Sequence, residues 1–100
     1  MPGLSLNVAH GLDLAEVMRR LRERCDSVKA AYQASVTNLE ETWSEDSLAC
    51  RFLAMGQKFQ GTLKAETGQV CVEMDLPLMA VMFRGTIESK VREELGKLLA

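Results

Sequence analysis

The sequence predicts an α+β domain: a curved antiparallel sheet with two helices on one face, in the order β-α-β-β-β-β-α. Apolar residues recur every three or four positions in two stretches, 14–33 and 87–99, which is typical of amphipathic helices. Apolar and polar residues alternate instead in 4–8 and through most of 36–76, which indicates strands with one apolar face. Polar or glycine-containing turns separate the later strands, so they should form an antiparallel meander with one wet face.

The chain opens with a short strand over residues 4–8. Its apolar face consists of Leu4, Leu6 and Val8. His10-Gly11 ends the strand, and His10 is the only histidine of the chain. A general base that activates a nucleophile needs a partner within reach, and the neighbouring Asp13 is better used as a helix cap. We therefore expect His10 to have a structural role at a strand-to-helix corner.

The first helix is expected from Leu14 to about Gln33. Asp13 as the N-cap and Glu16 three residues later predict a capping box. Leu12 before the cap and Val17 after it predict a hydrophobic staple. The helix then presents one apolar stripe, formed by Leu14, Val17, Met18, Leu21, Cys25, Val28 and Tyr32.

Four short strands are expected between Val36 and Leu76. Their core-facing candidates are Leu48, Phe52, Phe59, Leu63, Val70, Val72 and Met74. Glu41 interrupts the apolar face between Leu39 and Trp43. We therefore expect a bulge at this point, or a position on the sheet edge beyond the cover of the helices.

Pro77 ends the meander, and six apolar residues, Leu78 to Phe83, begin the second helix before its amphipathic part. Six consecutive apolar side chains cannot all belong to one apolar stripe. We expect this helix start to be wedged between the sheet and the first helix. The alternatives are a dimer contact, a cavity for an apolar ligand, and a surface that adsorbs on polymer or lipid. The candidate binding residues are Leu78, Met79, Val81, Met82 and Phe83.

Composition excludes several classes of protein. One hundred residues form a single domain, 1–100, and 12 Lys and Arg against 14 Asp and Glu argue against a nucleic-acid binder. No stretch is long and apolar enough for a membrane span, and the N-terminus lacks the pattern of a signal peptide, so we expect a cytoplasmic protein. The odd number and wide spacing of the cysteines predict free thiols and no zinc site. They are Cys25, Cys50 and Cys71.

The sequence contains no motif of a known catalytic, phosphate-binding or dinucleotide-binding site. Glu73 and Asp75 share the wet face of the last strand, about 6.6 to 6.8 Å apart along the strand, a spacing that suits acid–base work or a divalent ion. Alternating charge on a solvated sheet face is the commoner explanation. A second acidic group surrounds a turn and is expected to be solvated: Glu40, Glu41, Glu45 and Asp46. We therefore predict no catalytic residue, no metal ion and no cofactor.

In this order of elements, the sequence resembles the polyhydroxyalkanoic acid system family of small bacterial proteins. The resemblance lies in His10-x-Leu12 with Glu16, in Trp43, in Phe59-x-Gly61-x-Leu63, in Phe83-Arg84-Gly85-x-Ile87-Glu88, in Val91-x-x-x-Leu95 and in Leu98-Leu99. It covers nearly the whole chain. The family is named for genes near those of polyester storage, so the resemblance implies a cytoplasmic setting at storage granules. It carries over no catalytic residue.

A sheet held by a C-terminal helix is also the layout of the helix-grip, or START-like, lipid-binding folds, and implies the strand order 1-5-4-3-2. From these resemblances we predict a non-enzymatic accessory protein of polyhydroxyalkanoate metabolism that associates with granules or granule proteins through an apolar surface. One alternative is a small cytoplasmic module that holds an apolar ligand between the sheet and the C-terminal helix. Another is a small enzyme that acts on hydroxyacyl substrates. A homodimer is a further alternative, with Leu78 to Phe83 as the dimer contact.

Overall fold

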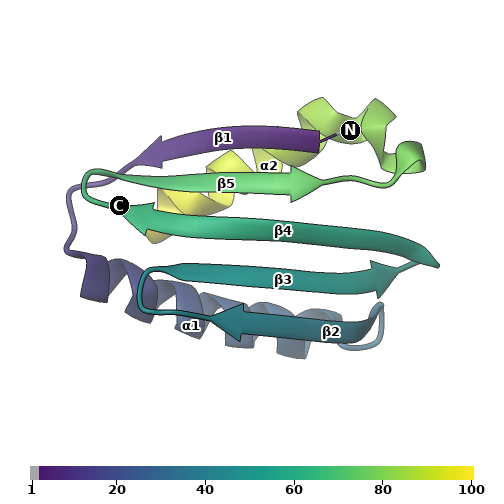
Figure 1. The fold of residues 1–100 in the computed structure, drawn as a ribbon, viewed down its shortest axis with the longest axis horizontal. Helices are drawn as coiled ribbons and strands as arrows, with labels where there is room; N and C mark the ends of the chain where they lie inside the picture. Colours follow the sequence, from purple (N-terminus) through teal and green to yellow (C-terminus); the bar gives the residue numbers. More distant parts are fainter. Residues whose placement is uncertain (1–2) are drawn as a thin grey trace.

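The computed structural model describes residues 3–100 and has the predicted order of elements, with one short 3₁₀ helix before the last α-helix (Figure 1). The elements are β1 (Gly3–Ala9), α1 (Leu14–Tyr32), β2 (Val36–Trp43), β3 (Ser47–Ala54), β4 (Gln57–Glu66), β5 (Gln69–Asp75), η1 (Leu78–Phe83) and α2 (Arg84–Leu98). The first helix ends one residue before the expected boundary, and all five strands lie where the alternating pattern predicted them.

The five strands form one open sheet in the order β1-β5-β4-β3-β2, and every neighbouring pair is antiparallel. This confirms the predicted strand order. Strands β2 to β5 follow one another as a meander, because each turn is short enough to return the chain alongside the strand it has just left. The first strand, β1, pairs with β5 along its whole length, so the N-terminal strand forms one edge of the sheet.

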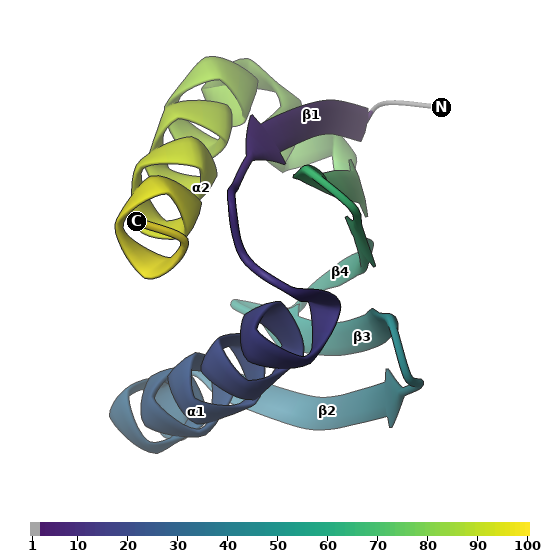
Figure 2. The ribbon, with the colours of Figure 1, turned by 90° about the vertical axis from the view of Figure 1, so that its left-hand side faces the viewer.

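Both helices lie on the same face of the sheet (Figure 2). Buried side chains from both helices meet those of β1, β4 and β5 in one core: Leu4, Leu6, Val17, Met18, Leu21, Ala65, Val70, Val72, Leu76, Leu95 and Leu99. The other face of the sheet is polar and open to water. Lys58, Lys64 and Glu73 are exposed on it, as the alternation of the strands requires.

The predicted capping box is absent. Asp13 is the N-cap of α1, but its side chain makes no capping hydrogen bond. The carboxylate of Glu16, which should have completed the box, instead accepts hydrogen bonds from Arg19 and Arg20 at 2.7 Å each. A charged guanidinium is a stronger donor than a backbone amide, so the two arginines take this carboxylate. Their hydrogen bonds hold the pKa of Glu16 at about 2, well below its ordinary value.

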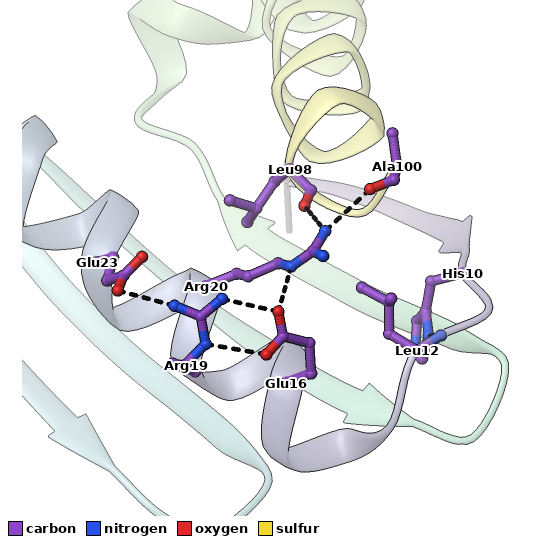
Figure 3. Close-up of polar contacts among 8 residues, drawn as sticks. All are labelled: His10, Leu12, Glu16, Arg19, Arg20, Glu23, Leu98 and Ala100. Carbon is purple, nitrogen blue, oxygen red and sulfur yellow. Dashed lines mark hydrogen bonds and ion pairs between the residues drawn. The ribbon is translucent and has the colours of Figure 1, made fainter.

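Arg20 also ties the two helices together (Figure 3). Its guanidinium donates from Nη1 to the carbonyl oxygens of Leu98, at 2.8 Å, and Ala100, at 2.9 Å. These carbonyls lie at the C-terminal end of α2, where no further turn of helix can satisfy them. One turn along α1, Arg24 forms an ion pair with Glu94 of α2 at 2.9 Å. The N-terminal half of α1 is therefore fixed to α2 by polar bonds as well as by the core.

The irregularity expected near Glu41 is partly as predicted. A bulge does occur in β2, but it lies between Thr37 and Glu40, where Asn38 has a positive φ of 53°. The interpretation of Glu41 as lying beyond the cover of the helices is wrong. Glu41 does lie on the edge strand β2, but its side chain is only 17% exposed and bonds to Lys29 of α1, because its pairing with Cys50 places it on the face that the helices cover.

Candidate functional site

The candidate binding segment Leu78–Phe83 is the short 3₁₀ helix η1, and most of it is exposed. Leu78 is 82% exposed, Met79 70%, Met82 80% and Phe83 57%. Val81 is half-buried, and Ala80 packs against the core. The expectation that this helix start is buried between the sheet and the first helix is therefore wrong. Four large apolar side chains face water instead.

The position of α1 explains this exposure. In Figure 1, α1 lies along the β2 edge of the sheet, whereas η1 follows the end of β5 near the opposite edge. The first helix therefore cannot cover η1. Of η1 only Ala80 packs against the core, which Leu76 before η1 and Leu95 and Leu99 after it otherwise complete.

A second apolar feature, which the sequence analysis missed, is a cleft of about 490 Å³ between the C-terminal half of α1 and strands β2 and β3. Its walls are mainly apolar, with Val28 and Tyr32 from α1, Leu39 from β2 and Phe52 from β3. No side chain of α1 after Leu21 is fully buried, so this half of the helix stands off the sheet. Val28 and Tyr32 are exposed because this half of α1 lies away from the sheet. Their positions in the apolar stripe of the sequence do not indicate this separation.

The polar groups in the cleft are paired. Lys29 donates to Oε1 of Glu41 at 3.0 Å, and the indole nitrogen of Trp43 lies 3.4 Å from the same oxygen. The hydrogen bond with Glu41 raises the pKa of Lys29. Burial raises the pKa of the Cys25 thiol to about 11, and burial also raises that of Cys50. Both thiols therefore stay protonated at neutral pH, which makes them poor nucleophiles.

Cys71, the third cysteine, is also a free thiol and lies on the open face of the sheet. Its pKa is raised, first by desolvation and then by a hydrogen bond from Sγ to a carboxylate oxygen of Glu66 at 3.4 Å. A nearby carboxylate disfavours the thiolate, since it places two negative charges side by side. None of the three cysteines has the electropositive surroundings of a reactive thiol.

His10 holds two turns together. Its Nδ1 accepts a hydrogen bond from the backbone N–H of Leu12 at 3.1 Å, so Nε2 carries the proton. That Nε2 donates to the carbonyl oxygen of Glu66 at 2.9 Å, and the backbone N–H of His10 donates to Gly68. Both ring nitrogens are therefore used in joining the β1–α1 loop to the β4–β5 turn. This is the structural role that the sequence predicted.

The acidic residues do not gather into one site. Asp75 accepts a hydrogen bond from Gln60 at 2.7 Å on the open sheet face, and Glu40 pairs there with Arg51. Glu41 faces the helices instead, and Asp46 lies near Lys64 at the other end of the sheet. Residues 3–100 contain no group of three or more acidic, cysteine or histidine side chains placed to hold a metal ion.

The geometry defines a small α+β domain whose conspicuous surface features are apolar: an exposed 3₁₀ helix and an open cleft. The family model described as "Putative polyhydroxyalkanoic acid system protein" matches residues 4–99, so the chain belongs to this family. No curated protein and no solved structure matches it. Among residues 3–100, neither α-helix combines the length and apolar character needed to cross a bilayer.

Proposed function

We propose that this protein is a non-enzymatic accessory protein of polyhydroxyalkanoate metabolism that associates, in the cytoplasm, with the storage granule through η1. The exposure of η1 carries the proposal. Leu78, Met79, Met82 and Phe83 are all more than half exposed, although large apolar side chains are normally buried. Family membership supplies the setting, and the apolar surface supplies a means of contact.

The expected strength of this contact suits a reversible association. Removing about 200 Å² of apolar surface from water contributes about 5 kcal/mol at 25 cal/mol per Å², before the costs of ordering are subtracted. Methionine suits such a surface because its unbranched, polarizable side chain adapts to an irregular partner. Charged residues follow on α2, from Arg84 to Lys97, and would remain in water.

The decisive experiment is fractionation of polymer-producing cells on a density gradient. The parent protein should float with the granules, whereas the Met79→Glu/Met82→Glu double variant should stay in the soluble fraction. Leu14→Glu is the matched control, because Leu14 is also exposed, at 38%, but lies on α1 away from η1. The proposal fails if the double variant floats as the parent does, or if the parent never floats.

A second candidate function is the binding of an apolar ligand, and the cleft beneath α1 favours it. The alternative suggested by the sequence placed such a cavity against the C-terminal helix. The cleft lies on the other half of the sheet, and no residue of α2 lines it. Its size is in the usual range for small-molecule sites. Titration with a fluorescent apolar probe should give saturable binding that Val28→Trp, which fills the cleft, abolishes.

The same layout supports a likeness to the helix-grip folds, in shortened form. The C-terminal helix α2 packs against β1, and both helices cover one face of an antiparallel sheet. A likeness of fold does not define an activity. The chemistry of the described residues supports a binding role over an enzymatic one, since the thiols are protonated and both ring nitrogens of His10 are engaged.

A further inference from the structure

The exposed apolar side chains of this protein gather at one end of the molecule. Nine large hydrophobic side chains are exposed in residues 3–100, and seven of them lie in three segments, 30–39, 52–57 and 76–83. The seven are Tyr32, Leu39, Met55, Leu78, Met79, Met82 and Phe83. Figure 1 shows that these segments lie at the same end of the sheet, because β2 starts, β3 ends, β4 starts and β5 ends on the right-hand side of the view.

The pairing of the strands places the first two segments beside one another, and the third follows β5, which pairs with β4. Val36, where β2 starts, pairs with Ala54 at the end of β3, and Ala54 pairs with Gln57 across the turn to β4. A shallow hollow at this end of the open sheet face is lined by residues of all three segments, among them Asn38, Leu53 and Pro77. Four charged residues that border the segments also line it: Glu40, Arg51, Lys58 and Asp75. The three segments thus form one surface, which we name the apolar tip.

The apolar tip carries no charge. None of its residues is Asp, Glu, Lys or Arg, although 26% of the chain is charged. Six charged residues border it along the chain: Lys29 and Glu40 at the first segment, Arg51 and Lys58 at the second, and Asp75 and Arg84 at the third. Two of the four basic residues are already paired with carboxylates, Lys29 with Glu41 and Arg51 with Glu40. The residues of the tip itself therefore match a surface without charge, since they include none of the basic side chains with which proteins bind anionic lipid surfaces.

Met55 provides independent support, because its position is unfavourable for folding. It lies at the β3–β4 turn with a φ of +53°, followed by Gly56 at +74°, so both central residues of this two-residue hairpin have positive φ. Asn-Gly is the preferred pair in such a turn, whereas a methionine there is strained. Its side chain is 92% exposed and so adds nothing to the core. A strained residue that folding does not require points to another use.

We propose that the whole apolar tip, and not η1 alone, is the docking surface, and that it lies flat on an uncharged aliphatic polyester surface. This inference rests on the proposed function, which assigns only η1 to the contact. It adds the β3–β4 turn with Met55 and the α1–β2 connection with Tyr32. Three separate contact points also orient the molecule, with the sheet standing on end and the opposite turns directed into water.

Co-sedimentation with amorphous polyhydroxybutyrate particles tests the proposal. Met55→Asn gives the turn its preferred residue while removing the side chain, so folding should improve as binding weakens by about tenfold, the contribution of one buried methionine or somewhat less. Met55→Leu should bind as the parent does. Tyr32→Gln should weaken binding independently. Leu14→Asn also replaces an exposed apolar residue with asparagine, but away from the tip, and should leave binding to the particles unchanged.

The outcomes separate this inference from the proposed function. Loss of binding in Met55→Asn and Tyr32→Gln, with Leu14→Asn unchanged, supports docking by the whole tip. If both variants bind as the parent does while Met79→Glu/Met82→Glu does not bind, η1 alone makes the contact and the inference is wrong. If the parent binds only anionic phospholipid vesicles, or only forms dimers in ultracentrifugation, the polyester is not the partner and both proposals fail.

Discussion

The two ends of the sheet differ in the side chains and hydrogen bonds of their connections. At the end opposite the apolar tip, the turns at residues 10–16, 44–47 and 66–69 contain five carboxylate side chains and no Lys or Arg. They are also bonded to neighbouring segments: His10 bonds to Glu66 and Gly68, and the amide of Ala65 donates to Asp46. The connections of the tip instead make local backbone hydrogen bonds, from the amide of Ser35 to the carbonyl oxygen of Tyr32 and from the amide of Ala80 to that of Pro77.

The polar end thus stabilises the fold, whereas the apolar tip contributes little to it and is free to contact a partner. The polar end fixes its turns by hydrogen bonds, and Arg20 there also anchors α2. The tip places large apolar side chains in water, which costs free energy unless another surface covers them. Substitutions at the two ends should therefore differ: those at the polar end and in the core change stability, and those at the tip change association.

The largest expected effect is from Val17→Asp. Val17 is completely buried beneath the sheet, so the variant places an unpaired carboxylate in the core. The cost is about 5 kcal/mol or more, comparable with the entire stability of a domain of this size. Circular dichroism should show an unfolded chain. Met82→Asp introduces the same group at the tip and should melt like the parent; unfolding of that variant would mean that η1 belongs to the core.

Arg20→Ala should lower stability by about 2 kcal/mol, because it leaves the carbonyls of Leu98 and Ala100 without their charged donor. Urea denaturation measures the change. Arg19→Ala is a closely matched control, since Arg19 is itself exposed and bonds only to side chains of its own helix, Glu16 and Glu23, so its removal should move the urea midpoint much less. Equal losses in the two variants would show that the link to α2 does not stabilise the fold.

Met55→Asn should raise stability by about 1 kcal/mol, because asparagine tolerates the positive φ that strains methionine. The midpoint of urea unfolding should move upward with an unchanged slope. Met82→Asn, an exchange on η1 where no positive φ occurs, should leave the midpoint where it is. A destabilised Met55→Asn variant would assign Met55 to the fold and weaken the contrast between the two ends.

The polar end should also weaken in acid through Glu16. Its pKa is about 2 in the folded protein, below the ordinary 4.5, so its contribution is complete above about 4.5 and is lost as the pH falls towards 2. Urea midpoints measured between pH 6 and pH 2.5 should fall for the parent. Glu16→Gln should start lower and fall less over this window. Parallel curves would show that Glu16 does not carry this pH dependence.

Much of the fold was predictable from periodicity alone. The alternation in 36–76 and the stripe from Leu14 to Tyr32 identified the strands, the first helix and the common face of both helices, because a period depends only on the geometry of one element. The strand order came from a likeness of fold and is confirmed. The capping box failed, since Glu16 could bond to a backbone amide or to arginines one turn away.

The amino-acid sequence by itself thus determined the elements, their order, the polar face of the sheet and the presence of six apolar residues without a place in one stripe. Only the tertiary structure decided where those residues point. Burial of Leu78–Phe83 depends on how far α1 reaches across the sheet, and α1 lies along the opposite edge. The apolar tip likewise joins Tyr32, Met55 and Met79, which are far apart in sequence, because antiparallel strands bring alternate connections to the same end.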